Sequence, residues 1–316
     1  MIQIGAMKNG KGELIARKSL SKSLKDDWQK YLMLMLPVLL VFIFAYLPMY
    51  GVVMPFQKFN IVKGIWGSKW IGFDNFIRTF TLPRFGRVLG NTLLINILSL
   101  ITHFPCPIIF AIFLSEMKNR RIIKVVQTVS YLPKFLSTVI VAGIVYQLCA
   151  PNTGLLNQII GALGGSNIPF LTKPIPWLAT YILSGIWEGI GWSSIIYIAA
   201  IAGVNPELYE AAIVDGATRM QKIWHITLPA IKGTIVLMLI LSMGGIISIG
   251  FDRPYCFGNP LVTDVSEVIS TFVYYVGLAQ GDYDLAATVG LFQSVVGFAL
   301  VMIVNAVAKA LGEQGL

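Results

Sequence analysis

Residues that could carry chemistry are few in this sequence and lie far apart. Among its 316 residues are three cysteines, Cys106, Cys149 and Cys256, and two histidines, His103 and His225. The cysteines match no CxxC or zinc-ligand spacing, and they lie in or near apolar segments, where they are expected to be small buried hydrophobes. The histidines are too distant in sequence to predict a metal pair. No GxxxxGK[ST] phosphate loop occurs, so we expect this chain to bind no metal or cofactor and to catalyse no reaction itself.

Polar and aromatic side chains that interrupt apolar stretches are the remaining candidates for binding. Polar groups inside hydrocarbon are costly and usually face the interior of a helix bundle. Lys134, Glu188 and His103 are the ionisable residues well inside such stretches. We expect Lys134 and Glu188 either to pair with each other or to bind carboxylate or hydroxyl groups of a ligand. The candidate residues of a polar pathway are Asn91, Asn96, Tyr131, Lys134, Trp187, Glu188, Trp192 and Tyr197.

The composition decides where such residues must be placed. Hydrophobic residues make up 56% of the chain and charged residues only 12%, against about 25% charge in a typical soluble domain. The mean hydropathy is +0.73. This composition excludes an ordinary soluble enzyme, a disordered chain and a disulfide-stapled module, and it indicates a membrane protein. The net charge of +9 does not indicate nucleic-acid binding, because the basic residues gather beside apolar runs.

Six apolar stretches approach the length of about 20 residues that a helix needs to cross the hydrocarbon core. We expect spans at about residues 31–54, 88–114, 125–149, 177–202, 234–250 and 286–308. Pro105, Pro107 and Pro133 are expected to bend the second and third spans. The predicted organisation is a basic tail over 1–30, a transmembrane domain over 31–309 and a short tail over 310–316. The expected fold is an all-α membrane protein with six transmembrane helices.

Loop charges predict the orientation of these spans, because cytoplasmic loops carry the excess of Lys and Arg. Residues 1–30 hold seven basic side chains, and the second–third and fourth–fifth connections are also basic. The only basic residues in the third–fourth and fifth–sixth connections are Lys173 and Arg253. One loop disagrees, since residues 55–87 carry Lys58, Lys63, Lys69, Arg78, Arg84 and Arg87. The majority places both termini in the cytoplasm.

The connection between the fourth and fifth spans, residues 205–229, is longer and more ordered than a turn between antiparallel helices requires. Asn205 suits a helix N-cap and Pro206 the first helical position, so a helix is expected to run to Val214. Asp215 and Gly216 then predict a tight turn. The expected product is a helix–turn–helix that protrudes into the cytosol, which we call the bracket.

The second half of the bracket is expected to be another short helix, over residues 217–226. This helix would expose Arg219 and Lys222. Its apolar residues, Met220, Ile223 and Trp224, would face the membrane body. Pro229 is expected to end the helix and redirect the chain into the fifth span, because proline cannot continue a helix interior.

The bracket carries a specific resemblance in three short groups, which are Glu210-Ala211-Ala212, Asp215-Gly216-Ala217 and Ile226-Thr227-Leu228-Pro229. These groups resemble the EAA loop of binding-protein-dependent ABC importer permeases, whose pattern is EAAxxDGAxxxxxFxxIxLP. The sequence departs from that pattern once. Ile223 occupies the usual aromatic position and Trp224 follows it, which leaves open the contact made there with an ATPase.

Further segments are similar to permeases that import oligosaccharides and polysaccharide fragments, including the alginate and pectin-fragment importers. They are Leu47 to Gly51, Trp187 to Tyr197, Ser266 to Gly277, Gly281 to Tyr283, and Ala286 with Ala287. The resemblance implies a type I ABC importer permease fold in a bacterial cytoplasmic (inner) membrane. It implies a sugar as the cargo, with an oligosaccharide favoured.

The resemblance also implies partners and residue roles. The chain would be one half of a permease heterodimer, served by an extracytoplasmic solute-binding protein and by a dimer of ATP-binding-cassette ATPase subunits that bind ATP and magnesium. The residues expected to couple to the ATPase are Glu210, Ala211, Ala212, Asp215, Gly216, Ala217 and Met220.

Two other functions remain open from the residues alone. An ion-coupled secondary transporter of small polar solutes predicts inverted repeats and carboxylates at the membrane midplane, and only Glu188 fits that description. A channel or membrane scaffold without energy coupling leaves the ordered bracket unexplained. The sequence names neither the sugar nor the residues that contact it.

Overall fold

The computed structural model describes residues 27–310, which divide into two compact units with a boundary between Val53 and Met54. Each unit is described here by itself. The predicted tails, residues 1–30 and 310–316, lie outside the described residues except for residues 27–30 and residue 310. In the first unit, α2 (Trp28–Val41) is followed by a π-helical turn, η1 (Phe42–Tyr46), and then by the 3-10 segment η2 (Leu47–Phe56), whose last three residues belong to the second unit. None of the residues of α2 is buried, so its apolar side chains are free to face lipid.

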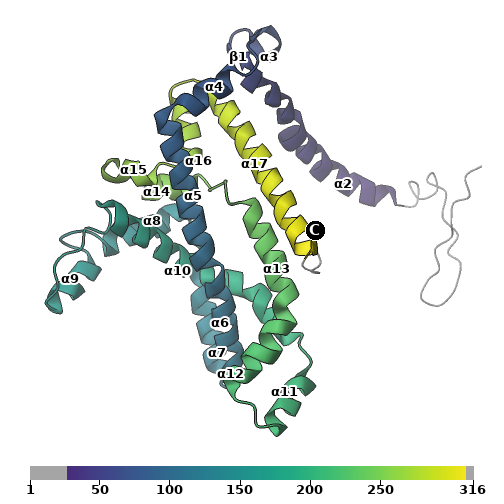
Figure 1. Ribbon diagram of the computed structural model, residues 1–316, viewed down its shortest axis with the longest axis vertical. Coiled ribbons are helices and arrows are strands. Elements are labelled where there is room, and N and C mark those ends of the chain that lie inside the picture. The colour runs from purple at the N-terminus through teal and green to yellow at the C-terminus, as the bar shows by residue number, and fades with distance from the viewer. Residues whose placement is uncertain (1–26, 311–316) are drawn as a thin grey trace, which may run out of the picture. The chain divides into compact units, whose positions relative to one another are not determined.

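The second unit begins with a small hairpin and then consists of helices. The first half contains β1 (Gln57–Lys58), α3 (Gly64–Gly67), β2 (Lys69–Trp70), α4 (Asp74–Thr81), α5 (Pro83–His103), α6 (Pro105–Glu116), α7 (Arg120–Tyr131), η3 (Leu132–Phe135), α8 (Thr138–Leu148) and α9 (Leu155–Ala162). The second half contains α10 (Pro174–Ala202), α11 (Pro206–Val214), α12 (Arg219–Lys222), η4 (Ile223–Thr227), α13 (Leu228–Gly244), α14 (Asp252–Phe257), η5 (Pro260–Val262), α15 (Thr263–Ser266), α16 (Ile269–Val273), η6 (Tyr274–Ala279) and α17 (Tyr283–Ala310). Figure 1 shows α13 and α17 side by side, and these two helices pack against each other.

The expected all-α class is confirmed, with one small exception. β1 and β2 form an antiparallel pair in which Gln57 lies opposite Trp70 and Lys58 opposite Lys69. Sequence analysis did not predict this pair, because two residues per strand are too few to produce an alternating pattern.

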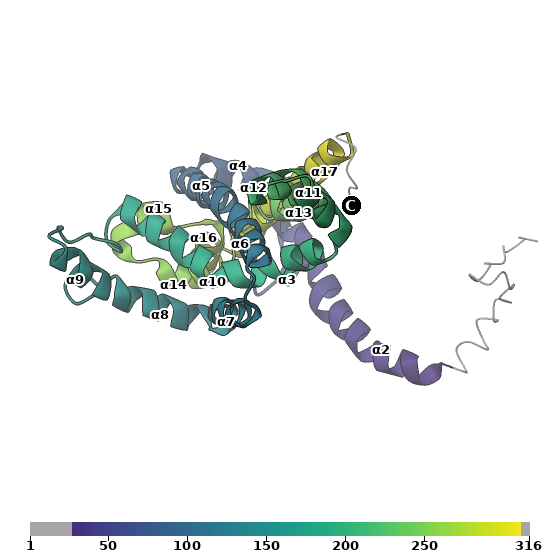
Figure 2. The ribbon, with the colours of Figure 1, turned by 90° about the horizontal axis from the view of Figure 1, so that it is seen from below.

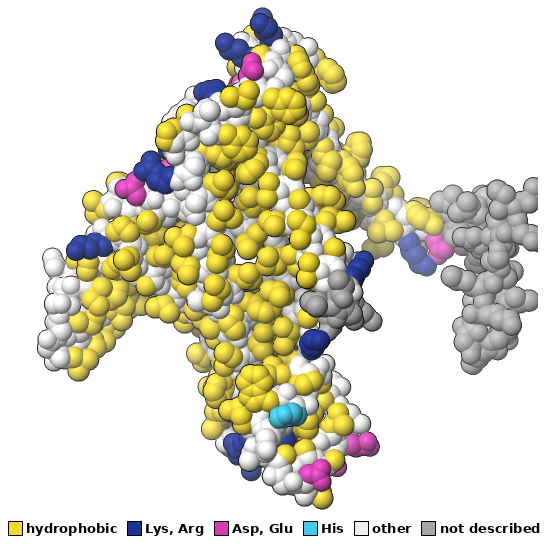
Figure 3. All heavy atoms as spheres, viewed as in Figure 1, with side chains coloured by type: hydrophobic (Ala, Val, Ile, Leu, Met, Phe, Trp, Pro, Cys, Tyr) yellow, Lys and Arg dark blue, Asp and Glu magenta, His cyan; other side chains and the backbone are white. Residues whose placement is uncertain are grey.

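Long apolar helices give the described part of the chain its membrane-spanning character. Five helices are long and apolar enough to cross a bilayer, and the number rises to as many as seven if each of two bent pairs counts as a span. The expected number of six therefore stays a prediction. Figure 3 shows hydrophobic side chains over most of the middle of one face of the second unit, with charged side chains toward its ends.

The structure differs from the simple spans that we expected because two of its helical segments are sharply bent. The third span is not one helix, because α7 with η3 and the following α8 meet at 105°. Pro133, in η3, lies at this bend, as expected from a residue that lacks a backbone N–H and restricts its predecessor. A second bent pair, residues 260–266 and 269–279, turns by 117° in the connection before α17, where no membrane segment was expected.

The buried core joins the helices that carry the candidate polar residues. Trp177 of α10 is fully buried, and its indole Nε1 donates to the carbonyl oxygen of Phe257 at 2.9 Å. The hydroxyl of Tyr146, on α8, donates to the same oxygen at 3.1 Å. Both contacts satisfy polar groups that burial would otherwise leave unpaired. Where α10 packs against α7, a Cβ on Gly191 would collide with the backbone of Ser130. Glycine at this position therefore permits the close approach of the two helices.

Three arginines at one end of the second unit pair with carboxylates that are distant in sequence. Arg78 contacts Asp282 at 2.5 Å, Arg84 contacts Glu267 at 2.5 Å, and Arg87 pairs with Asp264. The amide of Asn91 adds bonds to the carbonyl oxygens of Asp264 and Glu267 at 2.8 and 3.0 Å. These contacts fasten α4 and the start of α5 to the segment before α17.

Candidate functional site

The bracket begins as the sequence predicts. The side chain of Asn205 accepts a hydrogen bond from the Glu207 N–H at 3.1 Å, and Pro206 occupies the first turn of α11. After α11, Gly216 adopts a φ of 75°, a conformation that glycine reaches without steric cost. Thr218 and Gln221 then form a capping box at the start of α12. The cap, the helix and the turn are thus confirmed as local features.

The second half of the bracket differs from the prediction. α12, η4 and α13 form one continuous helix from Arg219 to Met243, so Pro229 does not end a separate helix. Pro229 lies in the first turn of α13, directly after the π-helical residues of η4. Proline is tolerated there because the wider π turn changes the hydrogen-bond partners of the preceding backbone.

The surface of the bracket is apolar as well as polar. Glu210, Ala211, Asp215 and Gly216 are exposed, while Ala212 and Ala217 are half-buried. Met220 and Trp224 are exposed and Ile223 is half-buried in this chain, and the expectation that the three face the membrane body stays a prediction. The other large exposed apolar side chains of the bracket are Leu208, Ile213 and Val214. A group of exposed apolar side chains rimmed by charge is typical of a protein-binding surface. Figure 1 shows the bracket helices α11 and α12 at the lower end of α13, and in Figure 2, seen from below, the three helices overlap.

Specific contacts hold α11 against the base of the long helix. The hydroxyl of Tyr209 lies 3.0 Å from the hydroxyl of Thr227, which is buried in η4. The Ala217 N–H donates to the Ala212 carbonyl oxygen at 2.8 Å across the turn. A force applied to α11 would therefore be transmitted to η4 and α13 through these bonds.

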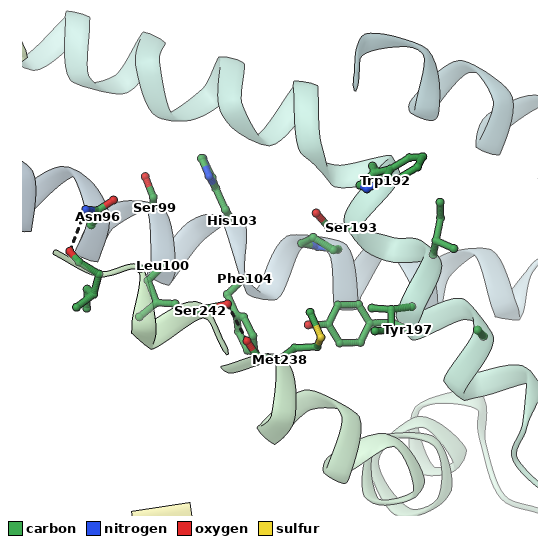
Figure 4. Close-up of a pocket in the computed structure, with 16 residues that line it drawn as sticks. Asn96, Ser99, Leu100, His103, Phe104, Trp192, Ser193, Tyr197, Met238 and Ser242 are labelled. Atoms are coloured by element: carbon green, nitrogen blue, oxygen red, sulfur yellow. Dashed lines mark hydrogen bonds between the residues drawn. The ribbon is translucent and has the colours of Figure 1, made fainter. Parts of the chain in front are cut away.

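A second candidate site is a cavity of about 810 Å³ between α5, α6, α10 and α13. Figure 4 shows Asn96, Ser99 and His103 projecting from α5, and Trp192, Ser193 and Tyr197 from α10. Leu100 and Phe104, with Met238 and Ser242 of α13, complete the labelled lining. Most of the lining is apolar, with a few hydroxyl, amide and imidazole groups among the hydrophobic side chains. Such a lining suits a ligand that has both apolar faces and hydroxyl groups.

The structure brings only some of the predicted pathway residues into this cavity. Asn96, Trp192 and Tyr197 line it, and Asn96 donates to the Ile246 carbonyl oxygen at 2.9 Å. Asn91 is instead buried in the contacts beside Glu267. The remaining predicted residues, Tyr131, Lys134, Trp187 and Glu188, are not among those that line the cavity.

Glu188 has a partner that the sequence did not indicate. Its carboxylate pairs with the guanidinium of Arg253 on α14, and the expected pair with Lys134 is present as well, with Nζ at 3.8 Å. The same guanidinium donates to the carbonyl oxygen of Tyr181 at 2.9 Å and to the Ser184 hydroxyl at 2.8 Å. It also lies 4.9 Å from the ring centroid of Tyr181. Arg253 therefore ties α14 to α10 through several groups at once.

Sequence reasoning missed Arg253 and Ser242 for identifiable reasons. Arg253 lies in a connection that we treated as an outer loop, and the short helix α14 around it has only six residues. The signal available was a single cation beside Pro254 in an aromatic segment of otherwise low charge. Ser242, near the end of α13, is a single hydroxyl in an apolar run and gives no pattern that distinguishes it from a serine bonded within its helix.

Comparisons with known proteins agree with the membrane-spanning helices. A family model described as "Binding-protein-dependent transport system inner membrane component" matches residues 104–313. The Bacillus subtilis polygalacturonan/rhamnogalacturonan transport system permease protein YteP is 45% identical over 91% of this chain and 90% of its own length. Protein LplB of the same organism is 40% identical over 96% of both chains.

Solved structures give the same result for the fold. The chain is similar to a crystal structure of a bacterial ABC transporter involved in the import of the acidic polysaccharide alginate. That similarity has a TM-score of 0.84 and 40% identity, and it covers 92% of this chain and 98% of the other. A second structure is the alginate transporter in complex with an alginate pentasaccharide-bound periplasmic protein. It has a TM-score of 0.85 and 39% identity, over 94% of this chain and 99% of the other.

Proposed function

Because this chain belongs to the family of binding-protein-dependent transport system inner membrane components, it is a membrane-embedded permease subunit of an importer, and we propose that its cargo is an oligosaccharide. Similar proteins named for polygalacturonan/rhamnogalacturonan, arabinooligosaccharide and alginate transport support this cargo class. The cavity supports it too, because Trp192 and Tyr197 offer aromatic surfaces beside hydroxyl and amide groups. We propose that this cavity is this subunit's share of a pathway completed by a second permease subunit.

The exposed bracket is the observation that carries the mechanism. Its residues Glu210, Ala211, Ala212, Asp215, Gly216, Ala217 and Met220 would contact a cleft on an ATP-binding-cassette ATPase subunit. ATP and magnesium would bind to that partner, since this sequence contains no phosphate loop. The exposed apolar side chains on α11 would be buried by such a contact. The hydrogen bond between the hydroxyls of Tyr209 and Thr227 connects α11 to the helices around the cavity.

Nucleotide-driven closure of the ATPase dimer would move the bracket, and with it the helices around the cavity, between inward-open and outward-open states. Such coupling requires nucleotide and cargo to bind the two states with different free energies. The energy would come from the partner, so this chain is proposed as a non-catalytic subunit. A solute-binding protein would deliver the oligosaccharide on the opposite side of the membrane.

We propose that both termini and the bracket lie in the cytoplasm. The distribution of Lys and Arg supports this orientation. The basic loop 55–87, which disagrees with this orientation by its charge count, is weaker evidence than that count suggests. Its three arginines, Arg78, Arg84 and Arg87, are paired with Asp282, Glu267 and Asp264. Asp282 is partly buried, which favours its neutral form, but hydrogen bonds with Asp284 and Arg78 outweigh that effect and hold the pKa of Asp282 below its ordinary value.

A charge placed on the bracket surface tests the proposed coupling. We expect Val214→Asp to abolish co-purification of the ATPase subunit and to lower ATP-dependent uptake at least tenfold, because the carboxylate would have to be desolvated at the docked surface. The matched control is Leu163→Asp, which places the same charge on an exposed leucine after α9. Both variants should insert in the membrane and retain the second permease subunit. Unchanged ATPase association in Val214→Asp would contradict the docking role, and uptake that follows an ion gradient without ATP would favour a secondary transporter.

A further inference from the structure

The basic hairpin, defined as residues 57–70, is the part of loop 55–87 that holds the basic side chains outside the ion pairs described above. The arginines of the loop are paired with carboxylates, but its lysines, Lys58, Lys63 and Lys69, all lie in this hairpin. Residues 57–70 contain no Asp or Glu. Over residues 27–310, none of the ion pairs involves one of these three lysines. The hairpin thus presents three cations that have no counter-ion among residues 27–310.

Two of the lysines are held next to each other by the strand register. Lys58 and Lys69 are directly opposed in the β1–β2 pair, so their side chains leave the same face of the hairpin. Like charges in directly opposed positions destabilise an antiparallel pair. An anion bound between the two ammonium groups would remove that repulsion.

The tip of the hairpin is apolar and exposed. Val62 is 91% exposed and Trp66 is 93% exposed, and Ile61 between the strands is exposed as well. Trp70 at the base stacks on Phe56 with ring centroids 5.5 Å apart, which keeps the strand ends in place. Tryptophan beside lysine is the combination enriched where protein meets the boundary between lipid headgroups and acyl chains.

Contacts with α17 place the hairpin at the level of the headgroups. The Phe59 N–H donates to an oxygen of Asp284 at 3.4 Å, and the Phe59 ring lies 6.0 Å from that of Tyr283. These two partners begin α17, whose membrane-spanning stretch runs from Tyr283 to Val307 over 25 residues. A helix of that length extends about 37 Å, longer than a hydrocarbon core of about 30 Å, so its first residues lie in the polar interface.

We propose that the basic hairpin is an interfacial anchor that binds anionic phospholipid headgroups in the membrane leaflet at the start of α17. A lipid phosphate binds between the ammonium groups of Lys58 and Lys69. Lys63 adds a third cation at the tip of the hairpin. Trp66 and Val62 enter the boundary between the headgroups and the acyl chains. Each lysine near an anionic surface raises the affinity of the segment for that surface by about fivefold. The proposal needs only that the chain is embedded in a membrane, and it is independent of cargo and of the ATPase.

Spin-label depth measurement tests the anchor in the assembled transporter. Val62→Cys is labelled after Cys106, Cys149 and Cys256 are replaced by alanine. The complex is then reconstituted in phosphatidylcholine with and without phosphatidylglycerol. We expect the label to collide more with oxygen than with a water-soluble nickel chelate in the phosphatidylglycerol bilayer. We also expect this preference to weaken in phosphatidylcholine alone, because the lysines then lack anionic headgroups.

Charge variants separate headgroup binding from mere proximity to the bilayer. Replacing Lys58, Lys63 and Lys69 together by glutamine should abolish the phosphatidylglycerol dependence at position 62. The matched control removes three charges next to the opposite end of the α5–α6 pair, by Lys118→Gln, Arg120→Gln and Lys124→Gln, and should leave that dependence intact. A photo-reactive residue at position 66, in the chain with its native cysteines, should give adducts with phosphatidylglycerol.

Two outcomes would overturn the anchor. The first is a label at position 62 that collides more with the nickel chelate in every lipid mixture, which would mean that the tip lies in water. The second is protection from both reagents only after the solute-binding protein is added, which would assign the hairpin to a protein interface. Neither outcome depends on whether the bracket binds an ATPase.

Discussion

At the residue scale, Arg253 is the charged side chain with the most contacts in the interior of the described bundle. Its guanidinium is mostly buried between Glu188, the Tyr181 carbonyl oxygen and two aromatic rings. A buried ion pair of this kind costs desolvation, but the removal of one partner costs more because the other charge is left unpaired. The sequence allowed Glu188 to be singled out, since a carboxylate in an apolar run is conspicuous. It could not reveal the partner, because no local pattern connects residues 65 positions apart.

We expect Glu188→Gln to lower the free energy of unfolding by about 3 kcal/mol, because it leaves the Arg253 guanidinium buried without its counter-charge. The double variant Glu188→Gln with Arg253→Gln should lose less than the sum of the single losses. Thermal unfolding of the purified transporter measures both. Asp74→Asn, which neutralises an exposed carboxylate, serves as the control and should change stability by less than about 0.5 kcal/mol. If uptake per assembled complex is also lost in the double variant, then a purely structural role for the pair is wrong.

At the element scale, the bracket was the most predictable feature because its signals are local. An N-cap at Asn205, a proline at the first helical position and a glycine at the turn act on the residues beside them, and all three behave as expected. The continuation through Pro229 was not predictable by the same rules. It depends on the π turn of η4, which shifts the backbone bonds and leaves no composition signature. The position of the 105° bend after η3 was predictable from Pro133, but the angle of the bend was not.

The turn itself offers a test at this scale. We expect Gly216→Ala to weaken ATPase association about fivefold, because an L-residue at φ 75° costs about 1 kcal/mol and reduces the population of the binding-competent turn. A titration of ATPase subunit against the purified permease measures this change. No other atom lies within 4 Å of a Cβ built at Gly216, so the effect is one of backbone conformation and not of steric collision.

Gly233→Ala is the matched control for this turn. Gly233 lies inside α13, and a Cβ there also meets nothing within 4 Å. Alanine is a better helix former than glycine, so this variant should leave ATPase association unchanged and leave stability unchanged or slightly raised. Equal loss of association in both variants would mean that the left-handed turn is not what the partner requires.

At the scale of the whole second unit, the fold is closed by contacts between segments nearly two hundred residues apart. Arg78, Arg84 and Arg87 reach the segment that precedes α17, and the Asn91 amide supports them. Sequence analysis took these arginines for a contradiction of the charge rule. Charge counting along a chain cannot show that an arginine and a distant carboxylate neutralise each other, because their proximity arises only after the helices pack.

Two of these pairs differ enough in the burial of their carboxylates for us to expect losses of stability of different size. Glu267 is 7% exposed and Asp264 is 78% exposed. We therefore expect Arg84→Gln to lower the free energy of unfolding by about 3 kcal/mol and Arg87→Gln by less than about 1 kcal/mol. Both arginines lie in the first two turns of α5, so helix propensity and position are matched. Chemical unfolding followed by intrinsic fluorescence measures the difference, and equal losses would show that burial of the carboxylate does not decide the strength of these pairs.

The continuous helix from Arg219 to Met243 has a mechanical consequence. One end carries the exposed Met220 and the other lines the cavity at Ser242, about 33 Å away along the axis. If this helix tilts as one body by about 10°, one end moves by about 6 Å relative to the other. The stroke of a motor acting on Met220 and the reshaping of the space beside Ser242 would then be a single event, with no separate step in which one could occur without the other.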